Sequence, residues 1–308
     1  MPEDETYYFT EEIIMKINQK KIAIIMRSYN DRDVIRQTLD MVFRQTVEDF
    51  ELWNFDSSST DGTVDIIREY NSEERIILND STIYNPGRVL NDAVARVDAD
   101  ILVFLNSDAS PADKYWLEKL IDPLIDPTVG AVYGRQTGRT DCRSLFVKDT
   151  ERAFGDGLEA SRWLHFFSMA NSAARRSVLL KKPFETRIQY SEDIDWSYRL
   201  KLDGYRVQYA KDAIAIHSHN YTLKQSYRRH FGEGSAEAWI FRRGELNLHW
   251  GRTFLMPFFA EVIRDLRWAA EQRSVDAALH TVPLRLTQKW ARWRGQKNGV
   301  KIFTAVTE

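Results

Sequence analysis

Carboxylates and small polar residues follow directly on apolar segments at several points of this 308-residue chain. In DADILVFLNSDASP, residues 98–111, an apolar run is followed at once by Asn106, Ser107 and Asp108. Ligands of α/β proteins bind beyond the carboxyl ends of the strands. A carboxylate there can bind a divalent cation that leaves its other positions to water and phosphate. The alternative is a turn in which these side chains only satisfy nearby backbone groups.

A second strand-like segment ends in the same way. In FDSSSTDGT, residues 55–63, Asp56 is followed by Ser57 and further small hydroxyl residues. Small side chains let a flat or phosphorylated ligand approach, and the Asp56 carboxylate can accept hydrogen bonds from a base or a ribose. A helix N-cap at Asp61 explains part of this motif, but it does not explain Asp56. By contrast, RSYN at 27–30 lacks glycine, which disfavours a dinucleotide-binding turn and therefore a nicotinamide or flavin enzyme.

Two later segments carry acids and imidazoles. SEDIDW begins a helical pattern with Glu192 and Asp193 in its first turn, where the helix dipole stabilises an ionised carboxylate. An ionised carboxylate can act as a general base toward a hydroxyl group, although plain helix N-terminal charge is the simpler explanation. HSHNY sets His217 and His219 on the same face of a strand. Either imidazole could complete a metal site with Asp108, whereas most isolated histidines only satisfy local polar groups.

The elements that must position these residues alternate between short apolar runs and helical patterns, from Lys21 to about residue 220. This alternation predicts an α/β domain with a mostly parallel sheet flanked by helices. Strands are predicted at 21–26, 50–55, 75–79, 101–106 and 130–134.

Helices are predicted between these strands. One spans 33–46, with an apolar face made by Ile35, Leu39, Val42 and Phe43, and another begins at Thr63. A further helix start is predicted from Ser110, Pro111 and Asp113, which suit a cap, a first helical position and a capping-box acid. Ser191 and Gly204 are predicted to bound the helix that carries the acids.

Composition restricts the function classes. With 43% hydrophobic and 29% charged residues and a formal net charge of −2, the chain has an ordinary globular composition and no sign of a nucleic-acid partner. The single cysteine, Cys142, excludes an intramolecular disulfide framework and indicates a reducing compartment. Residues 1–20 form an acidic leader without a secretory signal pattern, and the longest apolar run is too short to span a membrane. The expected location is the cytoplasm.

The last part of the chain changes in character. Residues 223–308 contain helical stretches, and residues 283–301 carry six basic residues and no acid. Leu284, Leu286, Trp290 and Trp293 mix with basic side chains there, which suits a peripheral contact with anionic lipids on the inner face of the cell membrane. The alternative is an amphipathic helix packed on the catalytic domain or on a second subunit. The predicted organisation is a leader at 1–20, a catalytic domain at 21–222 and a helical C-terminal extension at 223–308.

Taken together, five motifs in a fixed order resemble the family 2 glycosyltransferases, over about residues 20–220. The motifs are IMRSYN, DSSSTDGT, NPGRVLNDA, FLNSDASP and SEDIDW. The likeness is strongest to a bacterial subgroup of rhamnosyltransferases, and it implies the GT-A fold of nucleotide-diphospho-sugar transferases, with a Rossmann-like sheet. The resemblance also implies a Mg²⁺ or Mn²⁺ cofactor held by Asp108 and His217, with Asp193 as the catalytic base.

The remaining site residues are implied by the same resemblance. The implied donor nucleotide-binding residues are Ser28, Asn30, Asp56, Ser57, Arg88, Asn91, Asn106 and Ser107. The implied acceptor-side residues are Asn171, Glu192 and Trp196. Three departures from the family pattern stand out: Asn106 replaces the first acid of D-x-D, Ser57 replaces the second acid of the nucleotide motif, and Arg88 precedes its asparagine by three residues.

The implied activity is inverting transfer of a sugar from a nucleoside-diphosphate sugar, UDP- or dTDP-linked, to a hydroxyl of a glycan or lipid-linked acceptor. Such an enzyme would serve bacterial surface polysaccharide synthesis. One alternative is a non-catalytic protein of the same fold that binds sugar nucleotides or glycans. Another is a nucleotidyltransferase, but the segment after the first strand offers no glycine-rich, basic loop.

Overall fold

The computed structural model describes residues 20–241 and 248–307, with side chains up to residue 302. The predicted leader therefore lies, except for residue 20, outside the described residues. The described chain forms an eight-stranded sheet with the order β3-β2-β1-β4-β7-β6-β8-β5. The strands are β1 Ile22–Ser28, β2 Glu51–Asp56, β3 Ile76–Leu78, β4 Ile101–Asn106, β5 Ser110–Pro111, β6 Val129–Thr137, β7 Asn171–Arg175 and β8 Arg206–Ile216.

Parallel strand pairs outnumber antiparallel pairs in this sheet. β1 pairs in parallel with β2 and β4, β2 pairs in parallel with β3, and β6 pairs in parallel with β8. β7 runs antiparallel between β4 and β6, and β5 runs antiparallel to β8. All five strands predicted from apolar runs are present within a few residues of their predicted bounds. The predicted mostly parallel α/β sheet is thus confirmed.

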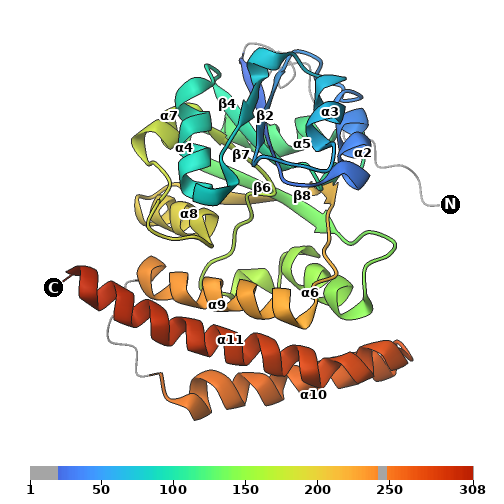
Figure 1. The fold of residues 1–308 in the computed structure, drawn as a ribbon, viewed down its shortest axis with the longest axis vertical. Helices are drawn as coiled ribbons and strands as arrows, with labels where there is room; N and C mark the ends of the chain where they lie inside the picture. The colour runs from blue at the N-terminus through green and yellow to red at the C-terminus, as the bar shows by residue number, and fades with distance from the viewer. Residues whose placement is uncertain (1–19, 242–247, 308) are drawn as a thin grey trace.

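Helices cover both faces of this sheet (Figure 1). α2, α3 and α5 pack on one face, while α4, α7 and α8 pack on the other. The α-helices are α2 Arg32–Val42, α3 Thr63–Arg68, α4 Pro86–Arg96, α5 Trp116–Ile121, α6 Ser144–Phe154, α7 Arg176–Lys181, α8 Glu192–Leu202, α9 Leu223–Ile240, α10 Met256–Glu271 and α11 Val275–Thr307. Shorter turns are the 3₁₀ helices η1 Glu73–Arg75, η2 Ser81–Ile83, η3 Asp122–Ile125 and η4 Ala160–Arg162, and the π-helical η5 Gly251–Leu255.

Two local predictions need correction. Ser110 and Pro111 do not start a helix: they form β5 against Ile216 and Ala215, and α5 begins only at Trp116. The edge pairing takes up backbone groups that a capping turn would otherwise have used. Phe43 is half exposed instead of joining the apolar face of α2, because the helix ends at Val42.

α8 starts where the sequence predicted, but Ser191 does not cap it. Ser191 precedes the helix in a left-handed conformation, with φ of 61°, and its hydroxyl makes no capping hydrogen bond. Its side chain faces the cavity described below instead. At the other end Gly204 adopts φ of 86°, which favours glycine and ends the helix as predicted.

The C-terminal helices form layers beneath the sheet domain. Figure 1 shows α9 nearest to that domain, α11 next and α10 outermost. A buried charge cluster joins α6 to the outer helices: Asp265 accepts hydrogen bonds from Lys148 at 2.6 Å and from Arg285 at 2.5 Å. Because buried charges persist only when they are paired, this cluster fixes α10 and α11 against α6.

The same packing uses basic residues that the sequence suggested for lipid headgroups. Arg285 also binds both carboxylate oxygens of Asp149, at 2.7 Å each. Lys289 lies 3.5 Å from Glu261, and Arg292 pairs with Glu237. Among the described helices, none combines the length and the low polarity that crossing a bilayer would require.

Candidate active site

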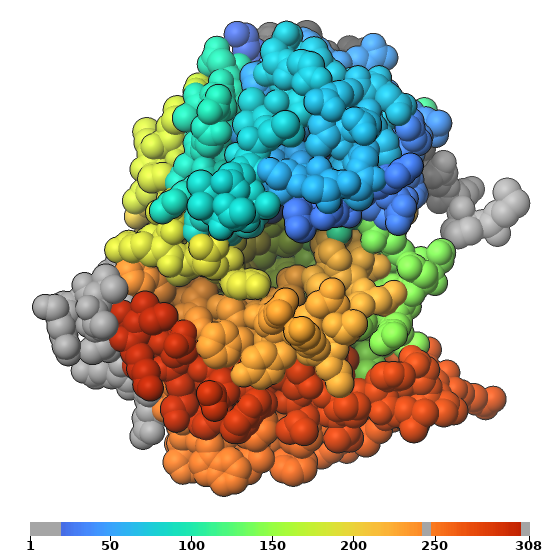
Figure 2. All heavy atoms as spheres, in the orientation of Figure 1, coloured from blue at the N-terminus to red at the C-terminus, as the bar shows by residue number. Residues whose placement is uncertain are grey.

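The carboxyl ends of β1, β2 and β4 meet at one edge of the sheet. Ser28 is in register with Asp56, and Arg27 is in register with Asn106. Beside these strand ends lies a cavity of about 1300 Å³, whose other walls come from α6, α8, α9, α10 and α11. Figure 2 shows the surface hollowed where the upper part of the molecule meets the orange α9. The edge that the sequence predicted to bind ligands therefore opens into a large pocket.

Most of the predicted site residues line this cavity. Those that do are Ser28, Ser57, Asn106, Ser107, Asp108, Glu192, Asp193 and His217. They come from five separate regions of the chain, so their convergence is a property of the fold.

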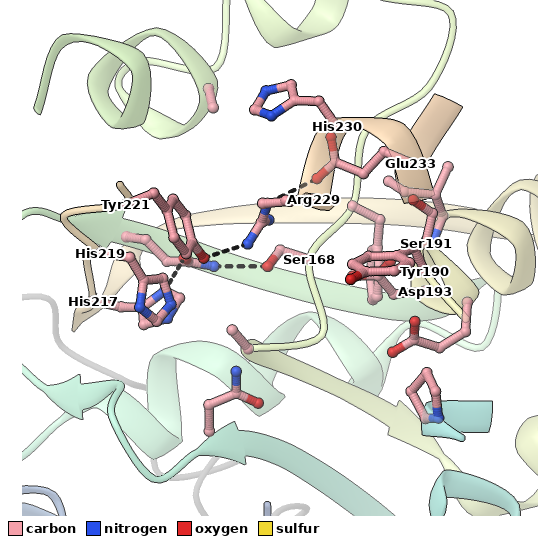
Figure 3. A pocket seen from close by; sticks show the side chains of 18 of the residues that line it. Ser168, Tyr190, Ser191, Asp193, His217, His219, Tyr221, Arg229, His230 and Glu233 are labelled. Carbon is pink, nitrogen blue, oxygen red and sulfur yellow. Dashed lines mark hydrogen bonds and ion pairs between the residues drawn. The ribbon is translucent and has the colours of Figure 1, made fainter. Parts of the chain in front are cut away.

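Asp108 lies at the centre of a cluster with two imidazoles. Its Oδ1 is 3.5 Å from Nε2 of His217, and its Oδ2 is 3.5 Å from Nε2 of His219. All three side chains offer one ligand atom within 4.8 Å of the others, as Figure 3 illustrates for the two histidines. Burial opposes ionisation of Asp108, but His217, His219 and Arg139 outweigh it and lower the pKa of Asp108 to about 2. The carboxylate is therefore charged at neutral pH.

The orientation of His217 suits a metal ion. Gln136 donates from its amide nitrogen to the Ser168 hydroxyl at 2.9 Å, so its Oε1 faces Nδ1 of His217, 2.7 Å away. The buried Nε2 has no hydrogen-bond partner and lies 3.5 Å from Asp108, where it can bind a cation when the proton is on Nδ1. A bare imidazole nitrogen beside a carboxylate is stable when a cation lies between them. The residues present thus fit a divalent metal, with an outer-shell amide fixing the histidine.

Asp193 lies across the cavity from the two histidines (Figure 3), and Glu192 precedes it in the first turn of α8. Backbone N–H groups of Met169 and Ile194 donate to the Asp193 carboxylate, at 3.1 and 2.8 Å. Burial nevertheless raises the pKa of Asp193, so the helix N-terminus does not dominate as the sequence suggested. Burial and the charge of Asp193 also raise the pKa of Glu192, to about 7, against the opposing effect of Arg27 at 3.3 Å.

Arg229 of α9 was not foreseen from the sequence. Its guanidinium donates to the Tyr221 hydroxyl at 2.6 Å and to Glu233 at 2.8 Å (Figure 3). The Tyr221 ring in turn stacks on His219, with ring centroids 5.0 Å apart. The positive charge of Arg229 offsets part of the rise that burial causes in the pKa of Asp193. The C-terminal extension therefore contributes a cation that lies between the Asp108 cluster and Asp193.

Three predicted donor-side residues organise the strand-end loops. Asp56 is fully buried and accepts hydrogen bonds from the hydroxyls of Ser28 and Ser59, at 2.6 and 2.7 Å. Asn30 lies outside the cavity lining and accepts from the backbone of Thr60 at 2.9 Å. Asn106 accepts from Arg27 at 3.1 Å, an interaction that suits an amide as well as an acid. This contact gives Asn106 a partner where the family pattern has its first acid.

Four other predicted residues do not reach the cavity in this conformation. Arg88 is exposed on α4, and Asn91 binds the backbone of Phe184 with both its amide atoms. Asn171 and Trp196 are fully buried, bound to Trp116 and to the backbone carbonyl of Lys182 respectively. Ligands do not contact fully buried side chains, so here Asn171 and Trp196 support the site by packing. The resemblance to the family implied these positions, but only the fold shows whether a side chain packs inside the protein or lines the cavity.

Comparison with known proteins agrees with this geometry. The model of glycosyl transferase family 2 matches residues 23–183, just over half of the chain. The chain belongs to this family. The predicted family, and with it the assignment of the protein as a glycosyltransferase, is confirmed.

The curated relatives include two O-antigen chain rhamnosyltransferases. RfbN of Salmonella typhimurium is 32% identical over 236 residues, which cover 72% of this chain and 75% of RfbN. WbaN of Salmonella anatum is 33% identical over 215 residues, which cover 65% of this chain and 67% of WbaN. The predicted likeness to bacterial rhamnosyltransferases is thus confirmed.

Solved structures confirm the predicted GT-A fold. The mannosyltransferase PcManGT from Pyrobaculum calidifontis, in complex with GDP-Man and Mn²⁺, superposes with a TM-score of 0.63 and 20% identity, over 91% of this chain and 87% of that one. Glucosyl-3-phosphoglycerate synthase from Mycobacterium tuberculosis, with Mn²⁺, UDP-glucose and phosphoglyceric acid, superposes with a TM-score of 0.54 and 19% identity, over 78% of this chain and 88% of that one.

Proposed function

We propose that this glycosyltransferase moves a sugar, with inversion, from a UDP- or dTDP-linked donor to a hydroxyl of a glycan or lipid-linked acceptor in bacterial surface polysaccharide synthesis. One observation carries the proposal: the Asp108 cluster with its imidazoles and the Asp193 carboxylate line the same cavity. The Asp108 cluster can hold the cation that a diphosphate binds, and the Asp193 carboxylate can accept the proton of an attacking hydroxyl. The names of the two curated relatives make a rhamnosyl donor the first to test.

Asp193 is proposed as the base. Backbone N–H groups at 3.1 and 2.8 Å hold its carboxylate, and its raised pKa makes it a better proton acceptor than an ordinary aspartate. It would take the proton from the acceptor hydroxyl as the oxygen attacks the anomeric carbon opposite to the departing diphosphate. A single displacement of this kind inverts the configuration. Arg229 stands near enough to Asp193 to limit how far its pKa rises.

The donor side is proposed to bind the nucleotide and its diphosphate. Ser28, Ser57, Asn106 and Ser107 line the cavity at the strand ends and are retained as donor contacts. Asp108 and His217 are proposed to hold Mg²⁺ or Mn²⁺, and His219 is equally well placed to join them. When bound there, the cation would supply positive charge that stabilises the departing nucleoside diphosphate.

Calorimetric titration tests this proposal. The protein is titrated with UDP, dTDP and GDP, each with and without Mn²⁺, and Asp108→Asn serves as the variant. The expected result is metal-dependent binding of one nucleotide, which Asp108→Asn loses. The exposed Asp141→Asn is a matched control that should bind like the wild type. No binding of any nucleotide to the wild type overturns the proposal.

Slow hydrolysis of the donor separates catalysis from the alternative of a non-catalytic binding protein. A binding protein would hold the nucleotide sugar without releasing free sugar. We expect release that depends on Mn²⁺, because water can replace the acceptor hydroxyl in the same cavity. Nucleotide binding without sugar release, and without transfer to any acceptor, would favour the binding protein.

We also propose that the extension at 223–308 works as part of the active site and touches the membrane through α10. Met256, Phe259, Ile263 and Leu266 are all exposed and follow helical spacing, which makes an apolar stripe on that helix. Arg267 lies exposed on the same helix and suits anionic headgroups. Co-sedimentation with vesicles of phosphatidylglycerol and phosphatidylcholine should fall in Ile263→Glu, and unchanged co-sedimentation refutes the contact.

A further inference from the structure

The cavity is larger than the proposed donor requires. At about 1300 Å³ it exceeds the roughly 300–1000 Å³ of a typical small-molecule site. Next to it, a side pocket of about 150 Å³ shares most of its lining residues with the main cavity. We call this side pocket the acceptor arm. Its walls include Arg152, Trp163, His230, Glu261, Gln288 and Lys289.

Each of the four cations that line the acceptor arm, Arg152, Arg285, Lys289 and Arg292, already pairs with an acid, Arg292 with Glu237. Arg152 donates to Glu261 at 2.7 Å, and Lys289 lies 3.5 Å from the same carboxylate. Arg285 donates from both terminal guanidinium nitrogens to Asp149, at 2.7 Å each. An incoming phosphate or carboxylate would have to compete with these acids for their cations, which is costly at a buried site. The arm therefore suits an uncharged ligand.

Its polar atoms suit a ligand that both donates and accepts. Nδ1 of His230 is 2.8 Å from the Ser226 carbonyl and donates to it, which leaves Nε2 as an acceptor. Gln288 accepts from Arg285 at 2.6 Å through Oε1, which leaves its amide N–H groups free to point at a ligand. Sugar hydroxyls are donors and acceptors at once, whereas a prenyl chain would leave these groups unsatisfied.

Trp163 supplies an apolar wall to the same arm. Its ring is held by the edge of Phe166, with centroids 5.2 Å apart, and by the guanidinium of Arg152 at 5.7 Å. A fixed aromatic ring with a polar surround fits the C–H face of a pyranose, which is the apolar side of an otherwise hydroxylated molecule.

We infer that the acceptor arm binds a neutral sugar unit of the acceptor glycan, behind the unit whose hydroxyl reacts. The inference rests on the proposed transfer function and adds the chemical class of its acceptor. It also gives the C-terminal helices a purpose, because α10 and α11 supply Glu261, Gln288 and Lys289. An acceptor of two or more neutral sugars should then bind better than a single sugar.

A chain-length series tests the inference. Mono-, di- and trisaccharides of rhamnose, galactose and mannose are titrated into the protein saturated with Mn²⁺ and its preferred nucleotide. The variants are Trp163→Ala and Trp163→Phe, with Trp250→Ala as the control, because Trp250 is exposed and lies outside the cavity lining. In the wild type and the control, one series should gain at least about tenfold in affinity from monosaccharide to trisaccharide.

Trp163→Ala should lose that gain while its monosaccharide and nucleotide affinities stay within about twofold, and Trp163→Phe should keep most of it. Retained nucleotide binding shows that each variant is folded. The inference is overturned if no trisaccharide gains over its monosaccharide, if Trp163→Ala keeps the gain, or if geranyl phosphate or a glucuronic-acid trisaccharide gains instead. Absence of nucleotide binding in the wild type would overturn the proposed function, and the inference with it.

Discussion

Replacing Glu192 with Gln should make the protein more stable at neutral and alkaline pH, but not at acidic pH. Glu192 is buried at the start of α8, where burial and the neighbouring Asp193 raise its pKa from 4.5 to about 7. In the unfolded chain the same group titrates near its ordinary value. The folded state therefore holds this proton more tightly, and the stability of the wild type falls as the pH rises from about 4.5 to about 7.

The size of the effect follows from that difference. A pKa raised from 4.5 to about 7, at about 1.4 kcal/mol per pKa unit, gives a penalty of about 3 kcal/mol once Glu192 is ionised in both states. Glutamine resembles the protonated acid and can still accept the hydrogen bond from Arg27. Glu192→Gln should therefore gain about 3 kcal/mol at pH 8 and almost nothing at pH 4.

Urea unfolding at pH 4, 6 and 8 measures this gain. Glu69→Gln is the matched control, because Glu69 is exposed and Arg36 lowers its pKa. Its loss of charge should weaken the fold slightly at pH 8, which is the opposite sign. If Glu192→Gln is no more stable than the wild type at pH 8, the carboxylate ionises without penalty. The raised pKa of Glu192 described above would then be wrong.

Further predictions concern the base, the metal ligands and the helical layers. Asp193→Asn should reduce transfer by at least about a thousandfold, with nucleotide affinity nearly unchanged, and near wild-type turnover would exclude Asp193 as the base. His217→Asn and His219→Asn should each weaken Mn²⁺-dependent nucleotide binding about tenfold or more in calorimetry, because each removes a candidate ligand; equal affinity with either variant would remove that histidine from the site. Asp265→Asn should lower the free energy of unfolding by about 3–5 kcal/mol, since it leaves the buried Lys148 without its acid and removes one of the two acids that pair with Arg285. A loss below about 1 kcal/mol in urea unfolding would contradict this.

Local chemistry explains which parts of the fold were predictable. Apolar runs such as 101–106 must be buried wherever they go, so five of the eight strands were predicted to within a few residues of their bounds. The turn after β4 was harder, because Ser110 and Pro111 suit a helix start and an edge strand equally well. Only pairing with β8, about a hundred residues later, decides between the two.

The same distinction applies to the site. The sequence by itself indicated the family, through the order of its motifs, and the α/β class, through its alternating apolar and helical segments. It also predicted Asp108, Asp193 and His217 as site residues, because strand ends and helix starts place such side chains by short-range rules. It left open which motif residues touch a ligand, since Asn171 has the same polar chemistry whether it lines a cavity or holds a core together. Tertiary structure alone brought Arg229 to the acids and turned the basic residues of α11 inward to Asp149 and Glu261. Charged residues that are far apart in the sequence pair only when the helices pack together, and no local sequence pattern predicts that packing.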